Sequence, residues 1–326
     1  ARVYLTWSHV AEGCGLSRKR SRLMVVDGKP QRRQVAQAPK LRWFRPSAYG
    51  FRVRVRLHDG QTPADVSKVV DRLAHAWRVH AVRVRDWGPG WVELVATTRD
   101  PLVNLKATQG DESAGLLRVH LGRLETGEPW VVDFRQVPHW LVIGATQSGK
   151  STDVNAMIRA LAPQPVALAG LDLKGGVELT PYESRLSRLA TTREECSTLL
   201  DDLLGLLADR MALCREHRVR NVWKLPEEVR QERAVPVVVF VDEVAELYLM
   251  ADKSEKEAVA KTSTALLRIA QLGRAFAVHL VVCGQRVGSD LGPGVTALRS
   301  QLSGRICHRV NDAETAKMAL GDLAPT

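Results

Sequence analysis

The tightest constraint on the fold is a glycine-rich octapeptide at residues 144–151, which has the spacing G-x-x-x-x-G-K-S. An apolar stretch at residues 139–143 precedes it and has the length of a buried strand. Apolar residues then recur at helical spacing along residues 150–161. This motif needs a strand before its loop and a helix after it, and the chain supplies both. The segment therefore predicts a phosphate-binding loop in an α/β fold.

Each part of this loop has an expected task. Its N–H groups and the start of the following helix are expected to surround the phosphates of ATP. Lys150 is expected to contact the β- and γ-phosphates, and the Ser151 hydroxyl to bind Mg²⁺. The residues expected to bind the nucleotide are Gly144, Ala145, Thr146, Gln147, Ser148, Gly149, Lys150, Ser151 and Thr152.

Two further apolar stretches end in polar residues that suit the same site. The first ends in Asp242 and Glu243, and the second is followed by Gln285. Because ligands of parallel sheets bind at the carboxyl ends of the strands, these side chains are expected to meet the phosphates. We expect Asp242 to hold Mg²⁺ through water, Glu243 to polarise the attacking water, and Gln285 to sense the γ-phosphate.

Short apolar stretches alternate with helix-length segments from about residue 117 onward. The expected strands are 140–144, 166–172, 236–242, 278–284 and 304–308. The expected helices between them are about 150–161, 192–217 and 254–273. This alternation predicts a mainly parallel sheet covered by helices on both faces.

The N-terminal part of the chain has a different pattern. Residues 1–46 show no sustained periodicity and are interpreted as a basic arm or linker. Residues 47–100 are interpreted as a small α/β domain of β-α-β-β order, in which a helix capped by Thr62 follows the first strand. Residues 101–326 are interpreted as the ATPase domain. The small domain carries no catalytic constellation, which favours an interaction or spacer role.

Positive charge is concentrated in the same N-terminal part. Residues 1–56 hold 14 Lys and Arg against 2 Asp and Glu, whereas the rest of the chain holds 33 against 34. One interpretation is a solvated, flexible arm. The other is an arm that contacts phosphates, either of nucleic acid or of an anionic membrane surface.

Composition excludes some classes of protein. The five cysteines are odd in number, widely spaced and without a C-x-x-C pair, which argues against a disulfide framework and a zinc site. No apolar stretch reaches the roughly 18 residues of a membrane span. The chain begins at Ala1 and ends in a loop-like segment, so we expect a fragment that is truncated at its C-terminus.

An arginine from a neighbouring subunit often stabilises the transferring phosphoryl group in this class of enzyme. Two arginines are candidates for that catalytic role. Arg210 lies on a long leucine-rich segment, and Arg274 follows the 254–273 helix.

The ordered motifs resemble the FtsK/SpoIIIE family of motor ATPases over about residues 117–326. The residues that carry the resemblance are the P-loop with Lys150-Ser151, Asp172-Leu173-Lys174, Val241-Asp242-Glu243 and the Cys283-Gly284-Gln285-Arg286 segment. The N-terminal Thr6-Trp7 and Gly13-Cys14-Gly15-Leu16 are similar to actinobacterial conjugation translocases of the TraB/TraSA kind.

The resemblance implies a RecA-like motor that forms hexameric rings and pulls double-stranded DNA through a central pore with ATP hydrolysis. It implies membrane association through segments upstream of this sequence, with the motor at the cytoplasmic face of the cell membrane. It also maps the trans-acting arginine of the family onto Arg210. Conjugative transfer is the leading function, and a chromosome-segregation translocase is an alternative.

Two departures from the family pattern keep other functions open. Gln147 stands where the DNA motors usually have glycine, and Asp172-Leu173-Lys174 replaces Asp-Pro-Lys. Gln147 also resembles the P-loops of type VII secretion ATPases, which move protein. A scaffold protein with a degenerate ATPase is a third hypothesis, which the presence of Lys150, Asp242 and Glu243 disfavours.

Overall fold

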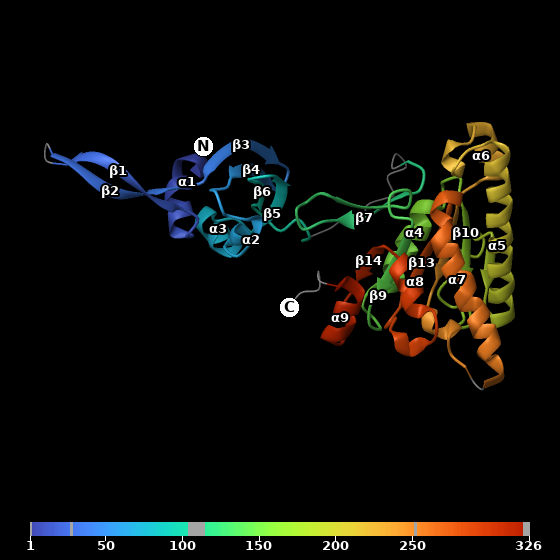
Figure 1. The fold of residues 1–326 in the computed structure, drawn as a ribbon. Helices are drawn as coiled ribbons and strands as arrows, with labels where there is room; N and C mark the ends of the chain where they lie inside the picture. Colours follow the sequence, from blue (N-terminus) through green and yellow to red (C-terminus); the bar gives the residue numbers. More distant parts are fainter. Residues whose placement is uncertain (1, 27–28, 104–114, 251–252, 322–326) are drawn as a thin grey trace. The chain divides into compact units, whose positions relative to one another are not determined.

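The structure is a computed structural model that describes residues 2–26, 29–103, 115–250 and 253–321. The chain forms two compact units (Figure 1). The first comprises residues 1–107 and 122–130, and the second comprises residues 108–121 and 131–326. The extreme ends of the chain, on which the expectation of a fragment rests, lie outside the described residues.

The second unit is built on a six-stranded sheet in which all neighbouring strands are parallel. Its spatial order is β11-β10-β12-β13-β9-β14. The strands are β9 (His139–Ile143), β10 (Ala167–Leu171), β11 (Arg188–Ala190), β12 (Val237–Val241), β13 (Val278–Gly284) and β14 (Gly304–Cys307). The predicted parallel sheet is confirmed, and β11 was missed because three residues are too few to show a pattern.

Helices cover both faces of this sheet (Figure 1). The long helices are α4 (Lys150–Leu161), α5 (Arg193–Glu216) and α7 (Lys256–Phe276), and they match the predicted ones. Leucines of α5 and α7 share one core with alternate residues of the strands. The short helices α6 (Glu227–Arg233), α8 (Val295–Gln301) and α9 (Ala313–Leu320) were not predicted. No helix in the described part of the chain is long and apolar enough to cross a membrane.

The first unit has a four-stranded antiparallel sheet of order β3-β4-β6-β5. Its elements are β3 (Lys40–Ser47), β4 (Gly50–Arg56), α2 (Pro63–Ser67), α3 (Val70–Trp77), β5 (Ala81–Gly88) and β6 (Trp91–Thr97). Thr62 is the N-cap residue of α2, and its N–H and hydroxyl both donate to the Asp65 carboxylate. The strands β7 (Arg118–Arg123) and β8 (Pro129–Asp133) form a separate two-stranded sheet.

Most of residues 1–46, which the sequence pattern indicated as a basic arm or linker, lie in regular elements. These residues form helix α1 (Arg2–Gly13), the hairpin β1 (Arg18–Val26) and β2 (Lys29–Gln37), and most of β3. In α1, Trp7, Val10 and Ala11 are buried against the small domain at a helical spacing that the sequence already held. The hairpin was missed because both its faces are exposed, so no apolar alternation marks it.

Buried basic side chains gather at the amino-terminal ends of the parallel strands. His139 Nδ1 accepts a hydrogen bond from the Leu280 N–H at 3.1 Å, and His279 Nδ1 lies 3.2 Å from the Pro138 carbonyl oxygen. Burial lowers the pKa of His139 to about 3 and that of His279 to about 4. Both imidazoles are therefore neutral in the folded chain near neutral pH.

We expect acid to destabilise the fold through these histidines. Their folded-state pKa values lie below the unfolded value of about 6.5, so below that pH the unfolded chain binds more protons. Above about pH 6.5 the histidines do not reduce the free energy of unfolding. As the pH falls from there toward 4, each histidine lowers the free energy of unfolding by about 1.4 kcal/mol per pH unit. Urea unfolding of the wild type and of His279→Asn across this range measures the slope. An unchanged slope in the variant would contradict the prediction for His279.

Candidate nucleotide site

The loop between β9 and α4 lies at the carboxyl edge of the sheet, and its backbone fixes it there. The Gly144 N–H donates to the Gly284 carbonyl oxygen at 3.2 Å, and the Ala145 N–H donates to the Arg309 carbonyl oxygen at 2.9 Å. A Cβ on Gly144 would lie 2.3 Å from Ser148 Oγ, so no larger residue fits without a shift of the loop. The loop is therefore tied to the ends of both strands that flank β9.

Two loop residues have the left-handed backbone conformation, Gln147 with φ of 60° and Gly149 with φ of 107°. Glycine adopts this region freely, whereas a residue with a Cβ pays roughly 1 kcal/mol or more. Glycine would adopt the backbone conformation of position 147 without strain. Gln147 adopts it as well and adds a polar side chain to the loop.

A cavity of about 420 Å³ lies over this loop. It is lined by Ala145, Thr146, Gln147, Ser148, Gly149, Lys150, Ser151, Thr152, Lys174, Glu178, Asp242 and Gln285. The Lys150 ammonium donates to the Gly144 carbonyl oxygen at 2.9 Å, which holds its charge beside the loop. The structure therefore brings the predicted loop residues together with Asp242 and Gln285.

The two acids after β12 have different surroundings. Burial, and after it the nearby Asp172 carboxylate, raise the pKa of Asp242 to about 6. Glu243 is 8% exposed, and its Oε2 lies 3.4 Å from the Lys174 ammonium. Its Oε1 has no hydrogen-bond partner among the described residues. Both carboxylates thus carry acceptor capacity that the protein itself leaves unused.

Lys174 and Glu178 belong to the site, although the sequence pattern assigned them no role. Asp172 positions both, because its buried carboxylate accepts from the N–H groups of Lys174 at 3.1 Å, Glu178 at 3.0 Å and Leu179 at 3.1 Å. These bonds fold the segment after β10 over the cavity. The sequence feature that could have indicated their role is the position of Asp172 directly after a predicted parallel strand.

The donor set suits a hard divalent cation bound together with phosphates. Mg²⁺ takes oxygen ligands and often uses only one or two protein groups beside phosphate and water. The Ser151 hydroxyl and the Asp242 carboxylate line the same cavity. Burial and, after it, the neighbouring acids raise the pKa of Asp242, and a bound cation would favour its charged form. Among the described residues, the site included, no cluster of three or more His, Cys, Asp or Glu could hold a metal ion.

The structure does not bring Arg210 to this site. Its side chain is 3% exposed, and its guanidinium donates to the carbonyl oxygens of Phe276 at 2.6 Å, Ala277 at 3.2 Å and Val235. These carbonyls precede β12 and β13, at the sheet edge opposite the loop. The interpretation of Arg210 as an arginine offered to a neighbour is therefore corrected to a buried structural role, since reaching outward would break all three bonds.

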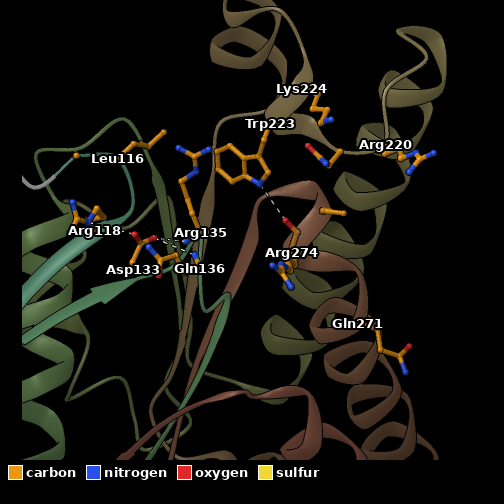
Figure 2. Close-up of a pocket in the computed structure, with 13 residues that line it drawn as sticks. Leu116, Arg118, Asp133, Arg135, Gln136, Arg220, Trp223, Lys224, Gln271 and Arg274 are labelled. Carbon is orange, nitrogen blue, oxygen red and sulfur yellow. Dashed lines mark hydrogen bonds and ion pairs between the residues drawn. The ribbon is translucent and has the colours of Figure 1, made fainter. Parts of the chain in front are cut away.

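Arg274 is exposed and lines a second, larger cavity of about 1200 Å³ (Figure 2). Trp223 stands beside it and donates its indole N–H to the Arg274 carbonyl oxygen at 3.3 Å. Arg135 lies 4.8 Å from the centre of a Trp223 ring. The remaining cationic side chains around this cavity are Arg118, Arg220 and Lys224. Arg274 is thus in a basic pocket rather than in the nucleotide cavity of its own chain.

A parallel sheet, a glycine-rich loop at its carboxyl edge and adjoining acids define a P-loop ATPase. Residues 103–289 match the FtsK/SpoIIIE family, and residues 1–98 match the actinomycete conjugal transfer protein N-terminal domain. The chain belongs to the FtsK/SpoIIIE family. The resemblance stated from the motifs is thereby confirmed for both halves of the chain.

Individual relatives agree with this assignment. The transfer protein TraSA of Streptomyces ambofaciens is 40% identical, in an alignment covering 99% of this chain and 80% of TraSA. DNA translocase FtsK of Pasteurella multocida is 28% identical over 79% of this chain, which spans only 31% of FtsK. The solved pCW3 conjugation coupling protein TcpA, in its monomer form with ATPγS, is 19% identical with a TM-score of 0.61. The structural match covers 98% of this chain and 87% of the TcpA chain, which shows that the two chains share a fold.

Replacing Arg210 by leucine should destabilise the fold rather than act on catalysis alone. Three carbonyl oxygens would lose their donor, and each such loss costs roughly 1–3 kcal/mol, so we expect a decrease of about 3 kcal/mol or more. Urea unfolding measures the change. Arg215→Leu, an exposed change on the same helix, is the control and should stay within about 0.5 kcal/mol. An Arg210→Leu protein of wild-type stability that loses ATP turnover would contradict the structural role.

Proposed function

We propose that this chain is an ATP-hydrolysing motor that moves double-stranded DNA in conjugative transfer. The observation that carries the proposal is the assembled nucleotide site in a chain similar to a transfer protein along nearly its whole length. The names of the FtsK relatives supply the class of cargo, DNA, and the choice of double-stranded DNA rests on the family resemblance. A chromosome-segregation translocase would use the same site and differs in the biological process.

The residues that line the cavity, together with Glu243, which contacts the lining residue Lys174, would divide the chemistry among them. Lys150 would neutralise the β- and γ-phosphates of ATP, and Ser151 and Asp242 would hold Mg²⁺. The cation would neutralise charge on the phosphate oxygens. Glu243 has an oxygen without a hydrogen-bond partner, so it has room to accept a proton from the attacking water. Lys174 lies against its other oxygen, and Gln285 faces the cavity, where it would contact the γ-phosphate.

We further propose a hexameric ring in which Arg274 acts on the neighbour's nucleotide. The described lining of the nucleotide cavity contains two lysines and no arginine, which leaves the arginine role open to a second subunit. Arg274 is exposed, makes no ion pair within the described chain, and lies among four further cations. Association with the cytoplasmic face of a membrane, through segments outside this sequence, is part of the proposal and rests on the family resemblance.

Duplex DNA should stimulate ATP hydrolysis if DNA is the cargo. We expect turnover to rise at least several-fold when duplex is added at moderate salt, and Lys150→Ala to abolish turnover in both conditions. A coupled ATPase assay on protein shown to form rings measures this. Rings that hydrolyse ATP without any response to duplex would contradict a DNA cargo and favour the protein cargo of type VII secretion ATPases.

Mixing two inactive variants tests the role of Arg274 in trans. Glu243→Gln should bind ATP without turning it over, and Arg274→Ala should lose most turnover while keeping ATP affinity. In mixed rings, a Glu243→Gln subunit would supply its arginine to an Arg274→Ala neighbour that has an intact glutamate, so turnover should return. The matched control replaces Glu243→Gln by the double variant Glu243→Gln/Arg274→Ala, which has no arginine to supply. Equal activity in the two mixtures would remove Arg274 from this role.

A further inference from the structure

The hairpin of β1 and β2 is a two-stranded ribbon that extends away from the rest of its unit (Figure 1). Nine residue pairs hold it together, from Arg18 opposite Gln37 to Val26 opposite Lys29. None of its residues belongs to the described hydrophobic core of the unit. Residues 18–25 and 30–35 are exposed on both faces. A ribbon without a core is only marginally stable in water, so it gains from a partner that covers it.

The ribbon is strongly cationic and its charge is not neutralised by the unit. The exposed cations are Arg18, Lys19, Arg20, Arg22, Arg32 and Arg33. The sequence from 18 to 37 contains a single acid, Asp27. In the described part of the chain, none of the six cationic side chains forms an ion pair. An anionic partner would therefore meet six free cations.

The register places these charges on both faces of the ribbon. Residues directly opposite each other share a face, and successive pairs alternate between the two faces. Arg22 lies opposite Arg33, an arrangement that repels without a bound anion. Arg18 and Arg20 share that face, whereas Lys19 and Arg32 lie on the other. Anions are thus expected on two sides of the ribbon at once.

We infer that the ribbon is a second DNA-contacting element, which lies in a groove of duplex DNA apart from the motor's nucleotide site. The major groove is about 12 Å wide, admits a two-stranded ribbon and has a wall of phosphates on each side. Leu23, Met24 and Val25, which are 66%, 45% and 74% exposed, offer apolar contacts to thymine methyl groups and sugars. The inference rests on the proposed function only for the choice of duplex DNA as the polyanion.

An anionic membrane surface fits the ribbon less well. A bilayer presents charge on one side, so it would leave the cations of the other face unmatched. The apolar residues Leu23, Met24 and Val25 are flanked in the sequence by charged residues, Arg22 on one side and Asp27 on the other. Burying both charges in lipid is costly. The charge pattern therefore favours a groove.

The test compares duplex binding by the full chain without nucleotide over a series of salt concentrations. The variant Arg20→Ala/Arg22→Ala/Arg33→Ala removes three cations from one face of the ribbon. The control Arg56→Ala/Lys68→Ala/Arg72→Ala removes three exposed cations elsewhere in the same unit. We expect the slope of log affinity against log salt to become shallower by about 3 in the ribbon variant and to stay unchanged in the control. Replacing the same three arginines by lysine should preserve the slope.

Equal slopes in the ribbon variant and the wild type would overturn the inference. So would unchanged duplex binding together with lost binding to phosphatidylserine vesicles, which would assign the ribbon to a membrane. ATP turnover at saturating duplex separates this inference from the proposed function. Turnover that responds to duplex in every protein, with equal salt slopes, would reject the ribbon inference alone. If the ribbon variant has a shallower salt slope than the wild type, but duplex does not change the ATP turnover of the wild type, only the motor proposal is rejected.

Discussion

The parallel hydrogen-bond ladder of the six-stranded sheet is the constraint on which the site depends. Parallel strands place all their carboxyl ends at one edge, so residues from distant parts of the chain meet there. Backbone bonds from Gly144 to Gly284 and from Ala145 to Arg309 then attach the phosphate-binding loop to the neighbouring strand ends. The position of Lys150 and Ser151 is consequently set by the backbone before any ligand contributes.

Buried polar and charged side chains have different partners at the two edges of this sheet. At the carboxyl edge, acids gather around a cavity, and burial and mutual repulsion raise the pKa of Asp242. At the amino edge, Arg210 donates to three backbone carbonyl oxygens, and the two neutral histidines contact backbone groups through Nδ1. A guanidinium held by three backbone carbonyls of its own chain stabilises the fold. A charged group with free acceptor capacity, such as Glu243, is available for chemistry.

The chain also separates its charge by unit. The ATPase unit carries a nearly balanced set of acids and bases, whereas the first unit concentrates its cations on an exposed ribbon and on the strands beside it. Within the sheet of that unit, Arg52 and Arg85 meet Glu128, so part of the excess is neutralised locally. The two strands of the ribbon contain no acid, and this local imbalance distinguishes a binding element from an ordinary solvated surface.

The sequence by itself determined the parallel sheet, its three long helices and the residues of the loop, because glycine spacing and apolar periodicity are local properties. It also identified Asp242, Glu243 and Gln285, because each follows a recognisable buried strand. Only the tertiary structure decided that Lys174 and Glu178 join the site, since hydrogen bonds to Asp172 fold that segment back. It alone showed that Arg210 is buried, because exposure depends on contacts with residues 25 to 67 positions away. The ribbon, too, became visible only in the tertiary structure. A strand that is exposed to water on both faces shows no alternation of apolar and polar residues in the sequence.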